Sequence, residues 1–168
     1  DDYGLSKSLG EPPNLTIIRT SIIGEELNNK LSLIEWCKSE PGREVFGYVD
    51  HLWNGVTCLE LCRFIHEDVI KPRNFWEGVH HVFSCKTVTK YQLAKMVSDV
   101  FDLDLKITPQ LKRKCYRNLS TKYNGFGMIS KTLKTQIKEL KEFNIHCQKI
   151  CSFIDLYNVY YSPMGYRV

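Results

Sequence analysis

The sequence has no apolar run that approaches the length of a membrane span, and no basic-plus-apolar signal segment opens it. It also lacks the Gly-x-Gly-x-x-Gly pattern of a dinucleotide-binding turn. Gly125 and Gly127 follow no strand-like run, and no third glycine completes the pattern. No two cysteines have the Cys-x-x-Cys spacing of a zinc knuckle. We therefore expect no membrane partner and no metal ion.

Cysteine is abundant rather than scarce, because the chain has seven of them. Cys58 and Cys62 have helical spacing within an apolar segment, and so do Cys147 and Cys151. A reduced cysteine packs as a small apolar side chain, which suits these surroundings. We expect free thiols and a cytoplasmic location, since reducing compartments keep thiols unpaired.

The composition is that of an ordinary globular protein, with 43% hydrophobic and 25% charged residues. Its 168 residues are enough for one domain with a core, or for one substantial piece of a larger domain. The formal net charge of +4 is too small and dispersed to indicate nucleic-acid binding. This charge suits an anionic small molecule instead.

Apolar runs rich in β-branched residues predict a buried parallel sheet. Residues 15–21 form one run without clean alternation, as expected of a strand buried on both faces. A second buried strand is predicted at residues 79–84, and shorter strands at 44–48 and 105–108. Parallel strands need crossover helices, so the predicted fold class is α/β. The other strands of the first sheet are expected mostly upstream of residue 1.

Helices are predicted at residues 28–39, 57–70, 131–143 and from residue 89 onward. The sequence TCLE is a capping box that opens the helix predicted at residues 57–70. The sequence TKYQ is a capping box that opens the helix predicted from residue 89. Helical spacing identifies the residues expected to face the core. These residues are Leu33, Trp36, Cys37, Leu61, Ile65, Leu93, Val97, Val100, Phe101, Leu133, Ile137 and Leu140.

The last segment, residues 151–168, is rich in tyrosine and apolar residues. Three interpretations fit this composition: a cover for a hydrophobic surface, a self-association element, or a poorly ordered tail.

Tyr3 and Lys7 are four residues apart in a segment, residues 3–11, that is predicted to end a helix, so they share one helical face. A lysine ammonium beside a phenol stabilises the phenolate and lowers the tyrosine pKa toward neutrality. Such a tyrosine can donate or accept a proton when a carbonyl and an alcohol interconvert. The same spacing also occurs by chance in many helices, where it marks only a solvated turn.

The residues around Tyr3 and Lys7 favour a catalytic pair over a solvated turn. The run YGLSKSLGE, followed by NLTIIRTSIIG at residues 14–24, resembles the extended short-chain dehydrogenase/reductase family. Within that family it is most similar to the dTDP-4-dehydrorhamnose reductase branch of sugar-nucleotide reductases. The resemblance continues through WNGVT, GVHHV and VTKY, and covers roughly residues 1 to 120.

The resemblance implies the C-terminal part of a Rossmann-like NAD(P)-binding fold with a small α/β substrate-binding subdomain. Residues 1–25 would be a remnant of the Rossmann domain, carrying the active-site helix and the strand after it. Residues 26–150 would be mainly the substrate-binding part, with elements returning to the sheet, and residues 151–168 an extension of unknown role. In this family the Gly-rich turn and a third catalytic residue, serine or threonine, precede the tyrosine. The chain therefore resembles the second half of a reductase.

The activity implied by the resemblance is reduction of the C4 carbonyl of a nucleotide-linked 4-keto-6-deoxy sugar, with hydride from NADPH or NADH. Tyr3 would be the general acid. Lys7 would hydrogen-bond the nicotinamide ribose and keep the tyrosine pKa low. Ser21 matches a position that lines the nicotinamide side.

Three further residues are implied at the substrate. Ile22 stands where these reductases typically have a tryptophan that contacts substrate, which leaves the sugar and nucleotide open. Trp53 would stack on the base or the sugar, or else pack into the base of its loop. Arg117 resembles an arginine that meets the nucleotide diphosphate; the alternative is a solvated surface residue.

Several alternatives remain at the level of function. A combined 3,5-epimerase/4-reductase would use the same site. A non-catalytic regulatory relative or an inactive truncated fragment would catalyse no reaction there. The family suggests a homodimer. The adjacent His80 and His81 do not indicate a metal site, because neighbouring side chains on a strand point to opposite faces.

Overall fold

The computed structural model describes residues 2–26, 28 and 30–161, of which Tyr3 and residues 150–161 are described by their backbone alone. Parallel strands alternate with helices, so the predicted α/β class is confirmed. None of the helices in the described ranges is long and apolar enough to cross a membrane.

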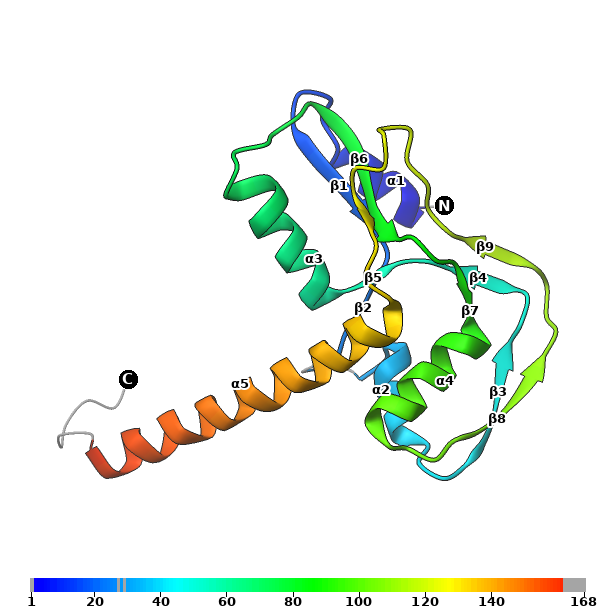
Figure 1. Ribbon diagram of the computed structural model, residues 1–168, viewed down its shortest axis with the longest axis vertical. Helices are drawn as coiled ribbons and strands as arrows, with labels where there is room; N and C mark the ends of the chain where they lie inside the picture. Colours follow the sequence, from blue (N-terminus) through cyan, green and yellow to red (C-terminus); the bar gives the residue numbers. More distant parts are fainter. Residues whose placement is uncertain (1, 27, 29, 162–168) are drawn as a thin grey trace.

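The central sheet has three parallel strands in the order β1 (Thr16–Thr20), β6 (Gly78–Ser84) and β10 (Met128–Ile129). The predictions of strands at 15–21 and 79–84 are thus confirmed. Figure 1 shows β1 and β6 side by side, with α3 (Cys58–Phe64) flanking them. Because the strands are parallel, their carboxyl ends meet at one edge, which is where open α/β sheets bind ligands.

The burial predicted for the first strand is wrong. No residue of β1 is fully buried, and Leu15 just before it is exposed. In the part of the chain that the structure describes, β1 pairs only with β6. Its other edge is therefore left without a neighbouring strand among these residues.

Three smaller sheets lie beyond the carboxyl edge of the central sheet. In the first, β2 (Ile22–Ile23) pairs with β5 (Val56–Thr57). In the second, β4 (His51–Trp53) lies between β7 (Val88–Thr89) and β9 (Cys115–Arg117). In the third, β3 (Glu44–Tyr48) pairs with β8 (Lys106–Gln110). The two short strands predicted at 44–48 and 105–108 are β3 and β8, so they pair with each other.

The helices begin mostly where hydroxyl side chains cap them. They are α1 (Asp2–Leu9), α2 (Leu33–Ser39), α3, α4 (Lys90–Phe101) and α5 (Leu133–Tyr161), with a π-helical segment η1 (Ile65–Ile70) after α3. At α4 the capping box is complete, because Thr89 and Gln92 exchange both bonds. At α3 the hydroxyl of Thr57 accepts from the Glu60 backbone N–H.

Two helices differ from their predictions. α2 begins only at Leu33, where the Ser32 hydroxyl caps it, and it buries Ile34 and Cys37 while Trp36 is 37% exposed. α5 continues well past residue 143, to Tyr161, as the long helix at the lower left of Figure 1. Residues 162–168 lie outside the described residues, and the role of residues 151–168 stays a prediction.

Two apolar clusters hold the fold together. The larger is formed by α2, α4 and the first turns of α5, where Leu93, Val97 and Ile137 are fully buried. The smaller lies between α3 and the central sheet, around Phe64 and Val82. Each buried aliphatic side chain of this kind stabilises the fold by about 1.5–3 kcal/mol.

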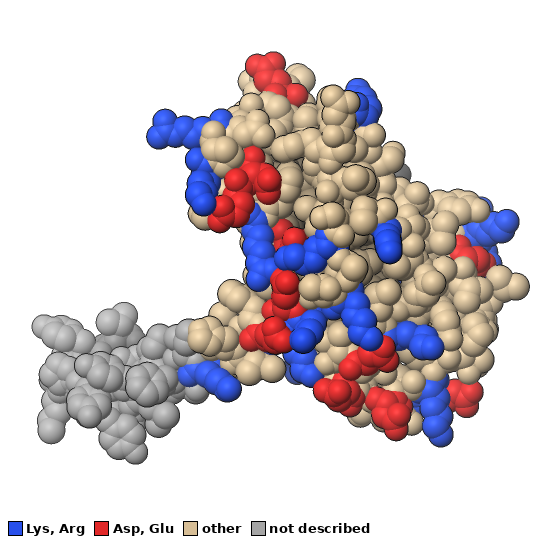
Figure 2. All heavy atoms as spheres, in the orientation of Figure 1, with Lys and Arg blue, Asp and Glu red and all other residues tan. Residues whose placement is uncertain are grey.

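Charged residues join the elements rather than form a patch. Arg63 of α3 and Lys131 both pair with Glu139 of α5, and Lys131 also reaches the largely buried Glu60 at 2.8 Å. Figure 2 shows basic and acidic side chains interspersed on the visible face. This distribution agrees with the dispersed charge of the sequence.

The six cysteines whose side chains are described are free. Burial raises the pKa of the Cys37 thiol to about 12, which keeps it protonated and inert. Cys37 is buried as a small apolar residue, but the prediction is wrong for Cys62, which is exposed, and Cys58 is only partly buried.

Candidate active site at the carboxyl edge of the sheet

Ser21 leads from the end of β1 into the loop at the carboxyl edge of the sheet. Its hydroxyl accepts a hydrogen bond of 2.7 Å from the indole Nε1 of Trp53 in β4. Its backbone carbonyl accepts from the Val56 N–H at 3.0 Å. Two residues selected from the sequence for different roles, Ser21 and Trp53, are therefore in direct contact. Trp53 is almost fully buried, so its ring packs into the base of the loop.

Gly55 makes this contact sterically feasible. A Cβ atom at Gly55 would overlap both the Ser21 carbonyl oxygen and the Trp53 ring. Only glycine fits where backbone and indole approach so closely. Gly55 therefore lies in a tightly packed junction between the end of β1 and β4.

Asn54 is only 3% exposed, and both the nitrogen and the oxygen of its side-chain amide are hydrogen-bonded. Its side chain donates to the Leu119 carbonyl at 2.9 Å and accepts from the Leu119 N–H at 2.7 Å. Its own carbonyl accepts from the Ser84 N–H at 2.7 Å. Asn54 thus joins the segment after β9 to the end of β6, as the pairing of a buried amide requires.

Ser84 and Gln136 extend this network to α5. The Ser84 hydroxyl donates to the Gly55 carbonyl at 2.8 Å and accepts from Gln136 Nε2 at 3.0 Å. Gln136 Oε1 accepts from the Thr57 N–H at 3.2 Å. We call Ser21, Trp53, Asn54, Ser84 and Gln136 the hydrogen-bonded frame.

Arg117 lies opposite Trp53 in the parallel pairing of β4 with β9, and it is exposed. Lys90, the first residue of α4, places its Nζ 5.9 Å from the centroid of the Trp53 ring. Burial, and then the nearby Arg117 guanidinium, lower the pKa of Lys90. We call Lys90 and Arg117 the cationic pair. Lys90 lies over the face of the Trp53 ring, whereas Ser21 bonds the Nε1 edge.

Ile22 follows Ser21 in β2 and is 53% exposed. Its backbone is fixed by pairing with Val56, so the side chain projects from a rigid strand. An exposed aliphatic side chain beside Ser21 is suitable for contact with a ligand.

Tyr3 and Lys7 lie in α1, one helical turn apart, as predicted. α1 is tied to β1 by an ion pair between Glu11, which follows the helix, and Arg19 of the strand. The hydrogen bond from Arg19 lowers the pKa of Glu11. The side chain of Tyr3 lies outside the described residues, so the catalytic roles of Tyr3 and Lys7 stay predictions.

A cavity of about 420 Å³ adjoins Lys90, and the sequence did not predict it. Trp36 of α2 and Phe46 and Tyr48 of β3 supply aromatic walls, and His51 lies with its ring centroid 4.7 Å from that of Tyr48. The only signal in the sequence was three aromatic residues at positions where one would expect core, two of which are exposed.

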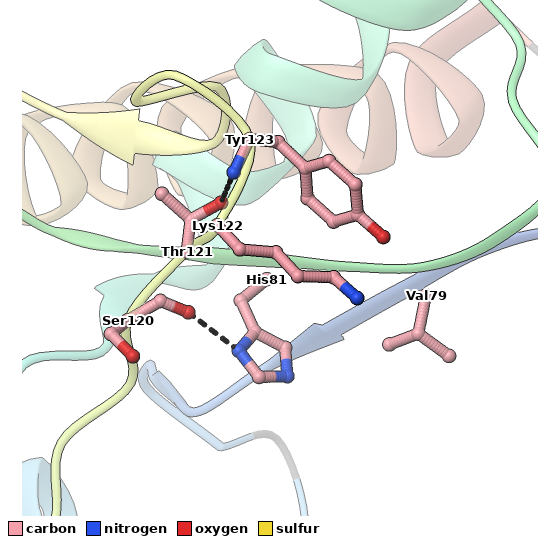
Figure 3. A pocket seen from close by; sticks show the side chains of 6 residues that line it. All are labelled: Val79, His81, Ser120, Thr121, Lys122 and Tyr123. Atoms are coloured by element: carbon pink, nitrogen blue, oxygen red, sulfur yellow. Dashed lines mark hydrogen bonds between the residues drawn. The ribbon is translucent and has the colours of Figure 1, made fainter.

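A second cavity, of about 290 Å³, lies over the middle of β6 (Figure 3). His81 lines it, and its Nδ1 donates to the Ser120 carbonyl at 2.8 Å, which leaves Nε2 without the proton in the neutral ring. His80, the neighbouring residue of the strand, stacks on Tyr123, which also lines the cavity. This cavity is away from the carboxyl edge of the sheet. Among the described residues no three metal-ligating side chains come together.

Comparisons with known proteins support the fold. A dTDP-4-dehydrorhamnose reductase from Clostridium acetobutylicum matches with a TM-score of 0.58 and 22% identity over 76% of this chain and 48% of its own. One from Bacillus anthracis, in complex with NADP, gives 0.57 and 17% over 74% and 46%. The UDP-glucose 4-epimerase of Thermotoga maritima, with UDP-glucose, gives 0.54 and 14% over 77% and 46%.

These matches define a class of fold. The chain shares the α/β architecture of Rossmann-like reductases and epimerases of nucleotide sugars, as the resemblance predicted. It spans about half the length of the solved structures it matches. No protein-family model matches the chain, and no curated protein has a similar sequence.

Proposed function

We propose that this chain is part of an NAD(P)H-dependent reductase of the C4 keto group of a nucleotide-linked 4-keto-6-deoxyhexose, with dTDP or UDP as the nucleotide. The observation that carries the proposal is the hydrogen bond between Trp53 and Ser21 at the carboxyl edge of the sheet. It joins a residue matched to the nicotinamide side with one matched to the substrate side. It does so in a fold shared with dTDP-4-dehydrorhamnose reductases.

Ser21 has a hydrogen-bonding capacity that fits a nicotinamide. Its oxygen accepts from the Trp53 indole, and its own hydroxyl hydrogen can donate to a carboxamide oxygen. Hydride transfer is the chemistry that bound NADPH or NADH supplies. Tyr3, Lys7 and Ser21 are the residues of this chain that would hold the nicotinamide end.

Proton transfer is assigned to Tyr3. Reduction of a ketone leaves a negative charge on its oxygen, and Tyr3 would donate the proton that neutralises it. Lys7, one turn along α1, would favour the phenolate and so bring the tyrosine pKa toward neutrality. The alcohol product then leaves with the proton of Tyr3, which is replaced from solvent.

Ile22, Trp53 and Arg117 are proposed to contact the substrate. Ile22 offers an exposed apolar surface in place of the tryptophan of similar reductases. Because Trp53 is only 3% exposed, little of its ring remains for contact with the substrate, and its larger role is to position Ser21. Arg117 supplies a guanidinium suited to a diphosphate. A cytoplasmic location and a homodimer complete the proposal.

The test uses the full coding sequence that contains these residues. NADPH and NADH oxidation is followed with dTDP- and UDP-linked 4-keto-6-deoxy sugars, with and without a 3,5-epimerase. We expect turnover with one of them, and we expect Tyr3→Phe to lower kcat by about 10²–10⁴-fold while leaving cofactor affinity unchanged. Oxidation with none of these sugars would favour a non-catalytic relative. A Tyr3→Phe effect confined to affinity would make Tyr3 a binding residue only.

A further inference from the structure

Lys90 is held in surroundings that disfavour its charge. It is half-buried at the N-terminal end of α4, where the partial charge of the helix is positive. A second cation, Arg117, acts on it through space. Burial, the helix end and the like charge all oppose an ammonium at this position.

The described part of the chain provides Lys90 with no carboxylate partner. Other lysines of this region differ: Lys38 pairs with Glu25 at 2.6 Å, and Lys134 pairs with Asp99 at 2.9 Å. Lys90 has the face of the Trp53 ring instead, at 5.9 Å. A cation–π contact of this length compensates only part of the cost of burying an ammonium.

The cavity beside Lys90 is suited to a planar, anionic ligand. Its volume of about 420 Å³ falls in the range of small-molecule sites. Trp36 and Phe46 present aromatic surface to it and are 37% and 57% exposed, although both are large apolar residues. Lys112 lies 4.8 Å above the Tyr48 ring, which adds positive charge at its border.

We propose that Lys90 binds the diphosphate of the nucleotide sugar together with Arg117, from the wall of the aromatic cavity. The inference rests on the proposed function and assigns to Lys90 a role that the sequence alone did not suggest. A diphosphate carries two anionic centres, and Lys90 and Arg117 present two cations on neighbouring elements, α4 and β9. Charge-assisted hydrogen bonds to both would remove the repulsion between them.

The free protein is thus arranged in advance for an anion. The backbones that carry the two cations are held by α4 and by the pairing of β4 with β9, so Lys90 and Arg117 stay on neighbouring elements. The partly dry site strengthens each electrostatic contact relative to water. The flat aromatic walls would meanwhile accommodate a base without requiring new charge.

The experiment compares ligands with and without the diphosphate. Binding of dTDP, UDP and thymidine to the protein is measured by calorimetry for the wild type, Lys90→Gln and Lys90→Arg. Lys95→Gln is the matched control, because Lys95 is an exposed lysine on the same helix. Of dTDP and UDP, the one that binds the wild type more tightly should bind Lys90→Gln about 10- to 100-fold more weakly. The affinity for thymidine should fall by less than about twofold. Lys90→Arg should recover much of the loss, and Lys95→Gln should resemble the wild type.

An equal loss for thymidine and the diphosphate, or no loss for either, would overturn the role of Lys90. The thermal stability of Lys90→Gln controls for folding. Failure of this inference is distinguishable from failure of the proposed function. If the wild type reduces the keto sugar and Lys90→Gln has the same KM, the reductase stands and Lys90 is not its diphosphate ligand. If diphosphate binding depends on Lys90 but no keto sugar is reduced, the site stands and the reductase function does not.

Discussion

The two sides of Trp53 differ in how completely their polar groups are satisfied. In the hydrogen-bonded frame, the buried amides of Asn54 and Gln136 bond at both ends. In the cationic pair, Lys90 has a ring face and a neighbouring cation, and no carboxylate among the described residues. A satisfied network stabilises the fold, whereas an unbalanced charge is retained where a ligand can balance it.

The comparison makes opposite predictions for the two sides. Substitutions in the frame should lower the stability of the fold and affect ligands only indirectly. Substitutions in the cationic pair should weaken ligand binding and leave stability unchanged or improved. Variants that are matched in size and location separate these outcomes.

Gly55→Ala should have the largest effect on stability. The added Cβ would overlap backbone at Ser21 and the ring of the buried Trp53, so the junction must open. We expect the free energy of unfolding to fall by about 3 kcal/mol or more, measured by urea denaturation. Gly10→Ala is the control, because there an added Cβ meets only the Lys7 carbonyl, at 3.5 Å. Equal losses for the two variants would remove the special role of Gly55.

Gln136→Ala should have the next largest effect. The side chain is 1% exposed, and its removal leaves the Thr57 N–H and one lone pair of Ser84 without their partner. Leaving a buried donor unsatisfied and opening a small cavity should cost about 2–3 kcal/mol. Gln148→Ala on the exposed part of α5 should change the unfolding midpoint very little. A result for Gln136→Ala as small as for Gln148→Ala would show that the frame does not depend on α5.

Lys90→Gln should have the smallest effect on stability, and the opposite sign. Because the pKa of Lys90 is lowered in the folded state, the unfolded chain binds its proton more tightly. The free energy of unfolding of the wild type should therefore increase, through Lys90, as the pH rises from its lowered pKa toward the usual value of about 10.4. We expect Lys90→Gln to melt higher than the wild type at pH 7, with the difference shrinking toward pH 10. A variant that melts lower at pH 7 would show that Lys90 stabilises the fold.

Local patterns were sufficient to predict much of the fold. The residues of β3 and β6 were recognised from their apolar content, and the box at Thr89 from hydroxyl and amide spacing. These features depend on neighbours within a few positions along the chain. Trp36 was assigned to the core wrongly, because helical spacing cannot show which turn of α2 the other elements cover.

The site was only partly predictable for the same reason. Ser21, Ile22, Trp53 and Arg117 were selected by resemblance, but their relative positions depend on pairings that span 32 residues and more. Asn54 was not selected from the sequence, since its partner Leu119 is 65 residues away. Lys90 belongs to a run that was recognised, VTKY, yet its burial beside Arg117 arises only from tertiary packing.

The most direct measurement follows the hydride itself. The full-length protein is incubated with NADPH deuterated at C4 of the nicotinamide, on the face that is transferred, and with the keto sugar nucleotide that supports oxidation. Mass spectrometry of the product is then compared for the wild type and Tyr3→Phe. A reductase should give a 6-deoxyhexose nucleotide with one deuterium at C4, and Tyr3→Phe should form it about 10²–10⁴-fold more slowly. Cofactor oxidation with no deuterium in the sugar, or equal rates for the two proteins, would contradict the proposed reaction.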